Sequence, residues 1–387
     1  MIKLLLITLL SSLVIAEDFA QFLQKAQVNS PYLKSSALVV TQAQESGSLL
    51  TRYANPSLEL EYSAFDSDIS DTQSGYRVNV SQPIRLWSVG DDKDVLAKSI
   101  KQRASASYQK NRATFTRDIS LLYTQYAQSK ALLILGDDEL EIAYDIYKIS
   151  KERYKLGTIS RGIMLQAKVA YEMIQIANET LVLRSQQTYF KLLRFAGVNE
   201  QIDLDTGYHF EIQSVTHLEN PGINLLNTQA QASLNQAKVD THAVEWVNLV
   251  GEYEKEPDQD IMRIGLNIPL AVFNTKSQEH TIANLETSRT QLLVSDETTK
   301  LHIDTLRLQK ERISLEKLQT KNIMILSTEL ELLAMFEEGY KIANVNLLEL
   351  QDIKNKVIST KESLIQIKTA LDQNAITTNY NQGTYNE

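Results

Sequence analysis

The sequence contains no cysteine and few of the residues that interrupt regular structure. Its 387 residues include only 13 glycines and 6 prolines. Without cysteine the chain has no disulfide, no thiolate metal site and no cysteine nucleophile. So few glycines and prolines argue against a loop-rich fold and most all-β architectures. Beyond its first residues the chain has no run of 18 apolar residues, so we expect no transmembrane helix.

The chain is acidic and carries no recognisable catalytic motif. Its net charge of −9 argues against nucleic acid as the main partner. We find no catalytic triad, paired-acid site or phosphate-binding loop. A loop from Asp66 to Asp71 lacks the glycine and glutamate of a calcium loop, and we interpret it as solvated. We therefore expect that the chain is not an enzyme and binds no cofactor. We also expect no metal site, because the five histidines show no metal-ligand spacing. They are His209, His217, His242, His280 and His302.

The N-terminus has the pattern of an export signal. Lys3 precedes an apolar run from Leu4 to Ala16, and the charged residue Glu17 follows. We predict a secretory signal peptide over residues 1–16, cleaved after Ala16. A membrane anchor is the weaker alternative, because the run is too short to span a bilayer comfortably. Export fits a protein of the bacterial periplasm or outer membrane.

The sequence contains a long internal repeat. Residues 76–84 resemble residues 262–270, and residues 153–157 resemble residues 339–343. Both pairs are separated by 186 positions. Repeats of this kind determine the whole fold. We therefore predict one structural repeat over 17–197 and a second over 221–374, joined by a linker at 198–220 and followed by a flexible polar tail at 375–387.

Four segments of about ten residues alternate between apolar and polar residues. They cover about 55–65, 76–86, 244–253 and 261–270. A period of two predicts strands with one apolar face, and ten residues suffice to cross a bilayer when the strand is tilted. A half-buried sheet of a soluble protein is the alternative. In a barrel the polar face would line the lumen with Glu59, Glu61, Arg77, Asn79, Asn248, Glu252, Arg263 and Asn267.

Aromatic residues at the ends of these segments favour the membrane. Rings at both ends of an apolar band are typical of the two water–lipid interfaces. Four strands cannot close a membrane barrel, and open sheet edges are not tolerated in lipid. We therefore expect the chain to form oligomers. The predicted aromatic belts contain Tyr62, Tyr76, Trp87, Trp246 and Tyr253.

Two very long helices follow the strand pairs. They are predicted over about 91–154 and 277–338, each followed after a short turn by a helix, over about 160–196 and 346–374. Apolar residues recur along the long helices in heptads, which predicts coiled-coil packing. A soluble antiparallel bundle would show the same seams.

The order of these features resembles a known family. Asn55-Pro56 precedes the first strand, and Ser81–Ile84 and Asn267–Leu270 end each strand pair. Arg153–Ser160 forms the turn between the helices of the first repeat. Together with the repeat, these marks resemble the TolC-like outer membrane efflux proteins (outer membrane factors), from about Asp18 to Asn374.

The resemblance implies a mainly α chain with a membrane β-barrel portion. Three copies would form a homotrimer with a twelve-stranded β-barrel in outer-membrane lipid and an α-helical barrel in the periplasm. Its tip would contact a periplasmic adaptor (membrane fusion) protein and an inner-membrane pump. The trimer would conduct exported solutes passively, in tripartite efflux or in type I secretion. The alternative is a periplasmic adaptor or a soluble coiled-coil scaffold.

The resemblance also assigns roles at the tip. The closing residues would be Tyr154, Tyr340, Glu349 and Asp352, and a ring of the two acids would favour cations. Alternatively, both acids are ordinary solvent-facing charges of a helix. The sequence identifies neither the solute nor the mode of gating. The turns expected to dock the adaptor contain Gly157, Thr158, Ser160, Ala343, Asn344 and Asn346.

Overall fold

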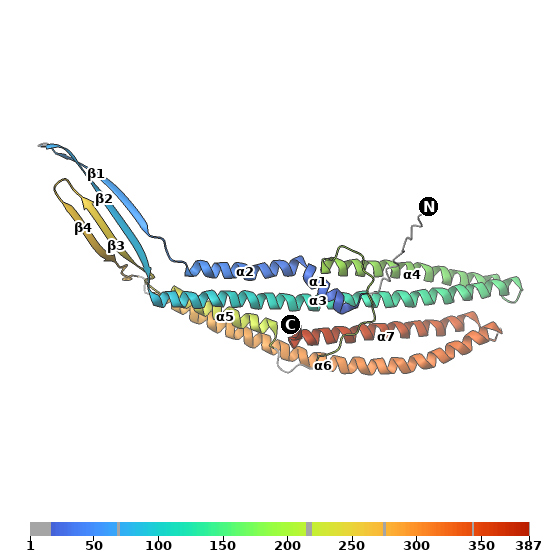
Figure 1. Ribbon diagram of the computed structural model, residues 1–387. Coiled ribbons are helices and arrows are strands. Elements are labelled where there is room, and N and C mark those ends of the chain that lie inside the picture. Colours follow the sequence, from blue (N-terminus) through green and yellow to red (C-terminus); the bar gives the residue numbers. More distant parts are fainter. Residues whose placement is uncertain (1–16, 68–69, 214–218, 274–275, 343, 387) are drawn as a thin grey trace, which may run out of the picture. The chain divides into compact units, whose positions relative to one another are not determined.

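The computed structural model describes residues 17–386, except 68–69, 214–218, 274–275 and 343. The predicted signal peptide lies outside the described residues. The chain divides into two units, which we describe separately. The helical unit consists of Met1–Lys34, Asn111–Asn220 and Leu301–Glu387, and the strand unit of Ser35–Lys110 and Pro221–Lys300. Two long helices, α3 (Trp87–Lys155) and α6 (Ser277–Lys341), contribute to both units (Figure 1).

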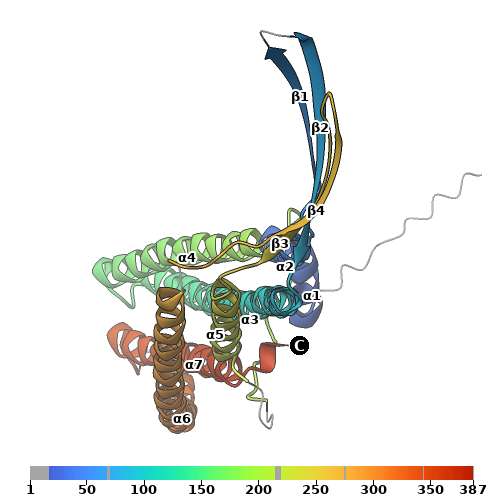
Figure 2. The ribbon, with the colours of Figure 1, turned by 90° about the vertical axis from the view of Figure 1, so that its left-hand side faces the viewer.

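The strand unit contains one antiparallel sheet in the order β1-β2-β3-β4. Its strands are β1 (Ser57–Ser67), β2 (Ser70–Arg85), β3 (Trp246–Lys255) and β4 (Asp260–Asn267). Figure 2 shows the strands side by side as a long, curved ribbon. The four strands and the antiparallel pairing within each repeat were predicted and are confirmed. The two repeats meet through β2 and β3, where Asn79 lies opposite Glu252.

Helices α2 (Pro31–Thr51) and α5 (Pro221–Asp240) precede the strand pairs of the two repeats. Each begins with proline at its first position. Proline is favoured there because its fixed φ suits the helix and its missing N–H has no helical acceptor. The two prolines therefore mark equivalent helix starts in the two repeats.

The helical unit contains two hairpins of long helices. The second half of α3 runs beside α4 (Arg161–Ala196), and the second half of α6 runs beside α7 (Leu347–Asn381) (Figure 1). Within the first hairpin the hydroxyl groups of Ser129 and Thr188 lie 2.6 Å apart. Within the second, the Asn374 amide donates to the carbonyl oxygen of Leu308 at 3.0 Å. These contacts fix the register of each hairpin.

Gly136 allows the helices of the first hairpin to approach closely. A Cβ atom at this position would lie 2.6 Å from the Leu181 Cδ1 atom of α4. Glycine in a helix interior costs about 1 kcal/mol relative to alanine, so its position here is explained by packing.

Two apolar clusters stabilise the helical unit. The larger joins α1 (Phe19–Asn29) to α3 and α4 through residues such as Phe22, Ile119 and Leu192. The smaller lies near the turns of the hairpins and contains Ile146, Ala167, Tyr340, Leu347 and Leu350. Among the residues that the structure describes, no helix combines the length and the apolar character needed to cross a membrane.

Several boundaries differ from those that we predicted. Strand β2 begins at Ser70 rather than near 76, and β4 ends at Asn267 rather than near 270. Helix α3 begins at Trp87 rather than near 91. The predicted start of the flexible tail, at residue 375, is wrong. Helix α7 continues to Asn381, and a short helix, η1 (Thr384–Asn386), follows. Ala375 and Ile376 are completely buried. Their burial holds this part of the chain in the helical unit, although most of its residues are polar.

Candidate functional site

All eight residues predicted to line a lumen lie on one face of the sheet. Residues directly opposite each other on paired strands point to the same side. The register pairs Glu59 with Asn79, Glu61 with Arg77, and Glu252 with Arg263. Asn79 is also opposite Glu252, which connects the two strand pairs on this face. Asn248 and Asn267 are opposite each other and extend the same face.

A network of ion pairs crosses all four strands on this polar face. The Arg77 guanidinium donates to Glu61 Oε2 at 2.9 Å and to Glu254 Oε1 at 2.8 Å. The Arg263 guanidinium donates to Glu254 Oε2 at 2.6 Å and also contacts Glu252. Arginine suits this arrangement because its planar fork binds two carboxylates at once. Glu254 was missed in the sequence because we placed it in a loop, although it continues the alternation from Glu252.

The opposite face of the sheet is apolar and exposed. Leu60 is 70% exposed and Ile264 is 81% exposed. Soluble proteins rarely expose contiguous apolar patches of this kind. The face therefore requires a covering of lipid or protein. Its exposed members include Leu58, Leu60, Tyr62, Tyr76, Val80, Ile84, Leu249, Met262, Ile264 and Leu266.

Aromatic residues lie at both ends of the sheet, but on the apolar face at only one of them. At one end Tyr62 is opposite Tyr76, whose ring centroid lies 6.1 Å from that of Tyr253. At the other end the Tyr53 and Trp246 ring centroids lie 6.0 Å apart. Trp246 lies there on the polar face, because it is two positions before Asn248 and opposite Arg85. The nine steps of β2 from Tyr76 to Arg85, which is opposite Trp246, measure about 30 Å along the strand. Tilted as in membrane barrels, this length gives roughly 21 to 25 Å, close to the height of their apolar band.

Arg85 organises the end of the sheet next to α3. Its guanidinium lies 4.5 Å from the ring centroid of Trp246 and donates to the carbonyl oxygen of Thr51 at 2.9 Å. Glu245 pairs with it at 3.3 Å. These contacts tie Arg85 and Trp246 to the segment that leads into β1. The predicted belt residue Trp87 lies two residues after Arg85, at the first position of α3. Its side chain is almost completely exposed.

The turn between α3 and α4 is a tight helix ending. Gly157 adopts φ +74°, a conformation that glycine accepts without strain. The Gly157 N–H donates to Tyr154 O and the Thr158 N–H to Arg153 O, the pair of bonds that defines a Schellman motif. Ser160 then caps α4 by accepting from the Ile163 N–H. Three predicted turn residues are therefore brought together, and each has a definable role in the turn.

The turn between α6 and α7 ends in a capping box. The Asn346 side chain accepts from the Glu349 N–H at 3.0 Å, and the Glu349 carboxylate accepts from the Asn346 N–H at 3.1 Å. Asn344 N–H donates to Gly339 O at 2.8 Å. The predicted turn residue Ala343 lies outside the described residues. These bonds give Glu349 a structural role in starting α7.

Tyr340 connects the two hairpins near their turns. The residue is 2% exposed, and its hydroxyl lies 2.8 Å from Ser150 Oγ on α3. The Arg153 guanidinium covers its ring at 4.9 Å and donates to its backbone oxygen at 3.2 Å. The predicted partner residue Tyr154 is 40% exposed and does not join this cluster.

The two acids predicted for a constriction lie on the exposed side of α7. Asp352 pairs with Lys356 at 2.7 Å, one turn further along the helix. Both acids are exposed in the single chain, as is Lys356. The residues described include no group of three or more His, Asp or Glu side chains arranged to hold a metal ion.

Comparison with known proteins identifies relatives of this structure. Residues 22–198 match the family model described as outer membrane efflux protein. A search of curated proteins returns no match. Among solved structures, the CmeC outer membrane channel of Campylobacter jejuni is 14% identical, with a TM-score of 0.74 over 94% of this chain and 85% of CmeC.

Two further structures have the same fold. The outer membrane protein VceC of Vibrio cholerae is 14% identical, with a TM-score of 0.74 over 94% of this chain and 95% of VceC. The open state of the MtrE outer membrane channel of Neisseria gonorrhoeae is 13% identical, with a TM-score of 0.74 over 94% of this chain and 88% of MtrE. The TM-scores establish a shared fold over almost the whole chain. At identities this low, the similarity shows the fold alone.

Proposed function

We propose that this chain, which belongs to the outer membrane efflux protein family through residues 22–198, is the outer-membrane exit channel of a tripartite efflux or type I secretion machine. Three copies would contribute twelve strands to a barrel in the outer membrane, and their helices would form a tunnel in the periplasm. An inner-membrane pump would drive solutes through it, and a periplasmic adaptor would join pump and channel.

The exposed apolar face of the sheet carries this proposal. Burial of apolar surface is the main favourable term in folding, yet Leu60 and Ile264 are left uncovered in a single chain. The sheet carries aromatic residues at both ends, and the span between them is close to the height of a membrane barrel's apolar band. A lipid bilayer would cover this face and leave the opposite, charged face towards water.

The open edges of the sheet argue for more than one copy. Strands β1 and β4 each pair with a single neighbour. Unpaired backbone groups are not tolerated in lipid, so the edges must close on other copies. Two copies would give an eight-stranded barrel, and side chains would fill its interior. Three copies would give twelve strands and leave a lumen lined by the ion-pair network around Arg77.

The helices also present apolar surfaces that a single chain leaves uncovered. Apolar residues form an exposed stripe on α4, at steps of four and seven residues, and part of the predicted seam of α6 is also exposed. Such seams are typical of coiled-coil contacts. Packing of these surfaces between neighbouring copies would form the tunnel wall. The α4 stripe contains Leu165, Val169, Ile176, Leu183 and Phe190, and the exposed α6 seam contains Leu318, Ile325 and Leu332.

The hairpin turns offer a docking surface for the adaptor. Leu156 and Leu348 are exposed apolar residues that lie beside the two turns. The turns themselves are fixed by the Schellman motif and by the capping box, so their shape is preorganised. We therefore assign adaptor docking to these turns.

Mass measurement of the membrane-extracted protein tests the proposal. The full chain is expressed in a Gram-negative host, its outer membrane is extracted with detergent, and the particle mass is measured by light scattering. We expect a trimer. A soluble monomer or dimer in the periplasm would refute the barrel.

A pair of variants separates the two faces of the sheet. Leu60→Asp places a charge on the apolar face, whereas Glu59→Gln changes the neighbouring residue on the polar face. We expect Leu60→Asp to lower the amount of outer-membrane trimer, because charge on the lipid face is unfavourable. Glu59→Gln should leave it unchanged. Equal yields from both variants would contradict the assignment of the faces.

A further inference from the structure

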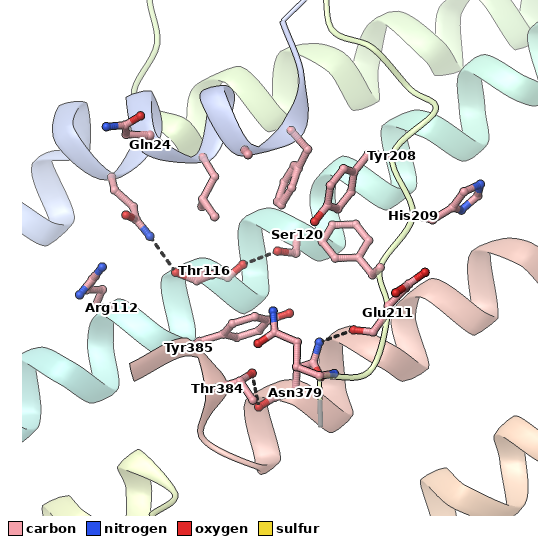
Figure 3. A pocket seen from close by; sticks show the side chains of 16 residues that line it. Gln24, Arg112, Thr116, Ser120, Tyr208, His209, Glu211, Asn379, Thr384 and Tyr385 are labelled. Atoms are coloured by element: carbon pink, nitrogen blue, oxygen red, sulfur yellow. Dashed lines mark hydrogen bonds between the residues drawn. The ribbon is translucent and has the colours of Figure 1, made fainter. Parts of the chain in front are cut away.

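The unfinished contacts of this chain lie at the two edges of its sheet. In the part of the chain that the structure describes, β1 and β4 each pair with a single neighbour. The helical unit differs. At a cavity of about 550 Å³ between α1, α3 and η1, Ser120 donates to Thr116 O at 2.7 Å and Asn379 donates to Glu211 O at 2.8 Å (Figure 3). An unpaired strand edge offers its backbone groups to another chain, so the sheet edges are where we expect a partner.

The four strands of one chain are in direct register. Residues directly opposite each other lead from Glu59 through Asn79 and Glu252 to Arg263. The strands of a closed barrel are tilted, so such a row returns to the first strand at a residue displaced along it. Because no displacement occurs within this row, all of it must fall at the junctions between chains.

The tilt of the strands sets the size of this displacement. For twelve strands about 4.8 Å apart, with about 3.4 Å per residue and a tilt of about 35–45°, the displacement around the barrel is about 12 to 17 residues. Three equal junctions would therefore take up about four to six residues each. The number must be even, because an odd one would turn the polar face of the next chain towards lipid. Four residues fit the tilt, whereas six would require a tilt of about 47°.

The lengths of the strands determine the direction. The row through Tyr62 ends at Asp260, where β4 begins, whereas β1 continues beyond Tyr62 to Ser67. A displacement of four residues towards the strand loops would therefore pair the whole of β4 with residues 59–66 of the next copy. The same displacement towards α3 would leave only Asp260 and Ile261 opposite β1. The longer first hairpin thus matches an outward displacement.

The polar residues at the two edges are complementary in this register. Among the described residues no cation pairs with Glu59, and the hydrogen bond that it accepts from an asparagine amide is 3.4 Å long. Asn267 would lie opposite Glu59 of the next copy and could donate to it. Gly265 would lie opposite Glu61, and the space beside Gly265 is open. Arg263 could therefore reach Glu61 of the next copy along the diagonal.

The apolar face favours the same register. Leu266 would lie opposite Leu60 of the next copy, and Met262 opposite Ala64. A displacement of six residues would instead place Met262 opposite Asp66. That pairing would bring a carboxylate against the apolar edge, and charge on the lipid face is unfavourable.

We propose that β4 of one copy pairs with β1 of a second copy at an outward displacement of four residues, with Asn267 opposite Glu59. The inference rests on the proposed channel and names the residues at which its copies join. Arg263 would carry the ion-pair network of Arg77 and Glu61 across each junction, so the network would continue around the lumen.

Disulfide formation between copies tests this register, because the chain contains no cysteine. Asn267→Cys is combined in turn with Asn55→Cys, Ser57→Cys, Glu59→Cys or Glu61→Cys, and outer membranes are oxidised and analysed on denaturing gels. Within one chain β2 and β3 separate the two cysteines, so a bond between them joins two copies. A step of two residues moves the partner by about 7 Å, beyond the reach of a disulfide. We expect covalent trimers to be at least about tenfold more abundant with Glu59→Cys than with the other three.

A second pair covers the opposite face of the sheet. Opposite Cα atoms are about 4.5 Å apart on one face of an antiparallel pair and about 5.5 Å on the other, and the closer face forms disulfides more readily. Leu266→Cys with Leu60→Cys should therefore cross-link if the polar pair does not, and Leu266→Cys with Tyr62→Cys is its control. Dominant cross-linking at any other position, or none in either expected pair, would overturn the proposed register.

The mass of the extracted particle keeps this result apart from the channel itself. A trimer whose expected cysteine pairs fail to cross-link would refute the register and leave the proposed function standing. A particle that is not a trimer would refute the proposed function, and the register would fall with it. Each variant is therefore measured for particle mass under reducing conditions before it is oxidised.

Discussion

Replacing Tyr340 by phenylalanine is expected to loosen the contact between the two hairpins. The Ser150 hydroxyl donates its proton to the Ile146 backbone oxygen at 2.8 Å. The Tyr340 hydroxyl must therefore be the donor in the 2.8 Å bond to Ser150 Oγ. Phenylalanine removes this bond and retains the ring beneath the Arg153 guanidinium. The change consequently isolates one hydrogen bond between α6 and α3.

The magnitude follows from the burial of both groups. A hydrogen bond of this kind contributes about 1 kcal/mol, because its loss leaves only an acceptor without its donor. In the Tyr340→Phe variant, the ratio of chains with separated hairpin ends to chains with packed hairpin ends should therefore rise about fivefold. Ser150→Ala should cost more, about 1 to 3 kcal/mol, because it leaves the buried tyrosine hydroxyl without an acceptor. The double variant should resemble Tyr340→Phe alone.

Hydrogen–deuterium exchange of the backbone amides measures this opening. We expect faster exchange in the last turn of α6 and the first turn of α7 for Tyr340→Phe. Tyr154→Phe is the matched control, because Tyr154 is exposed and lies in the other turn. If both variants exchange equally, the Tyr340–Ser150 bond does not hold the hairpins together. Additive effects in the double variant would also contradict the reasoning.

Three further variants address the tip and its neighbourhood. Asn346→Ala should lower the free energy of unfolding by about 1 kcal/mol, measured by chemical denaturation, because the N-cap of α7 is lost. The pair Glu349→Gln and Asp352→Asn should reduce cation preference in single-channel recordings while retaining the capping box, which glutamine also supports; unchanged selectivity would remove both acids from the constriction. Burial lowers the pKa of Lys354 below its ordinary value of 10.5. Between the two values the unfolded chain binds more protons than the folded chain, so the free energy of unfolding should rise with pH in this window. Thermal unfolding at alkaline pH should show this slope for the native chain and its absence for Lys354→Met.

The sheet was predictable from sequence because its information is local. Alternation fixes which side chains share a face, since a shift by one residue would reverse every strand. The eight predicted polar residues therefore lie together, as Glu61 and Arg77 illustrate. The position of the turn between β3 and β4 was less well defined. Lys255 pairs with Asp260 across it, and this pairing extends β3 through Glu254, which we had assigned to the loop.

The end of α7 was not predictable because its stability comes from distant residues. Residues 375–387 are mostly polar, and local composition favours a mobile tail. In the structure Tyr380 lies under the Arg117 guanidinium at 4.5 Å and its hydroxyl is 3.3 Å from Thr114. Both partners lie on α3, more than 250 residues earlier in the sequence. Ala375, Ile376 and Tyr380 were the local signals in this segment, because alanine and isoleucine are among the residues most often buried and tyrosine is intermediate.

The acids at the tip show the limit of reasoning from one chain. The sequence places Glu349 three residues after Asn346, a spacing that predicts a capping box as readily as a charged constriction. The structure contains the capping bonds, which occupy one carboxylate oxygen and leave the net charge in place. Capping and a role in a constriction are therefore compatible. A constriction is a property of several copies around an axis, and neither local spacing nor the fold of one chain determines the distance between carboxylates of different copies. The selectivity of the paired Glu349 and Asp352 variant reports on that distance directly, because a ring of acids influences ions only where the passage is narrow.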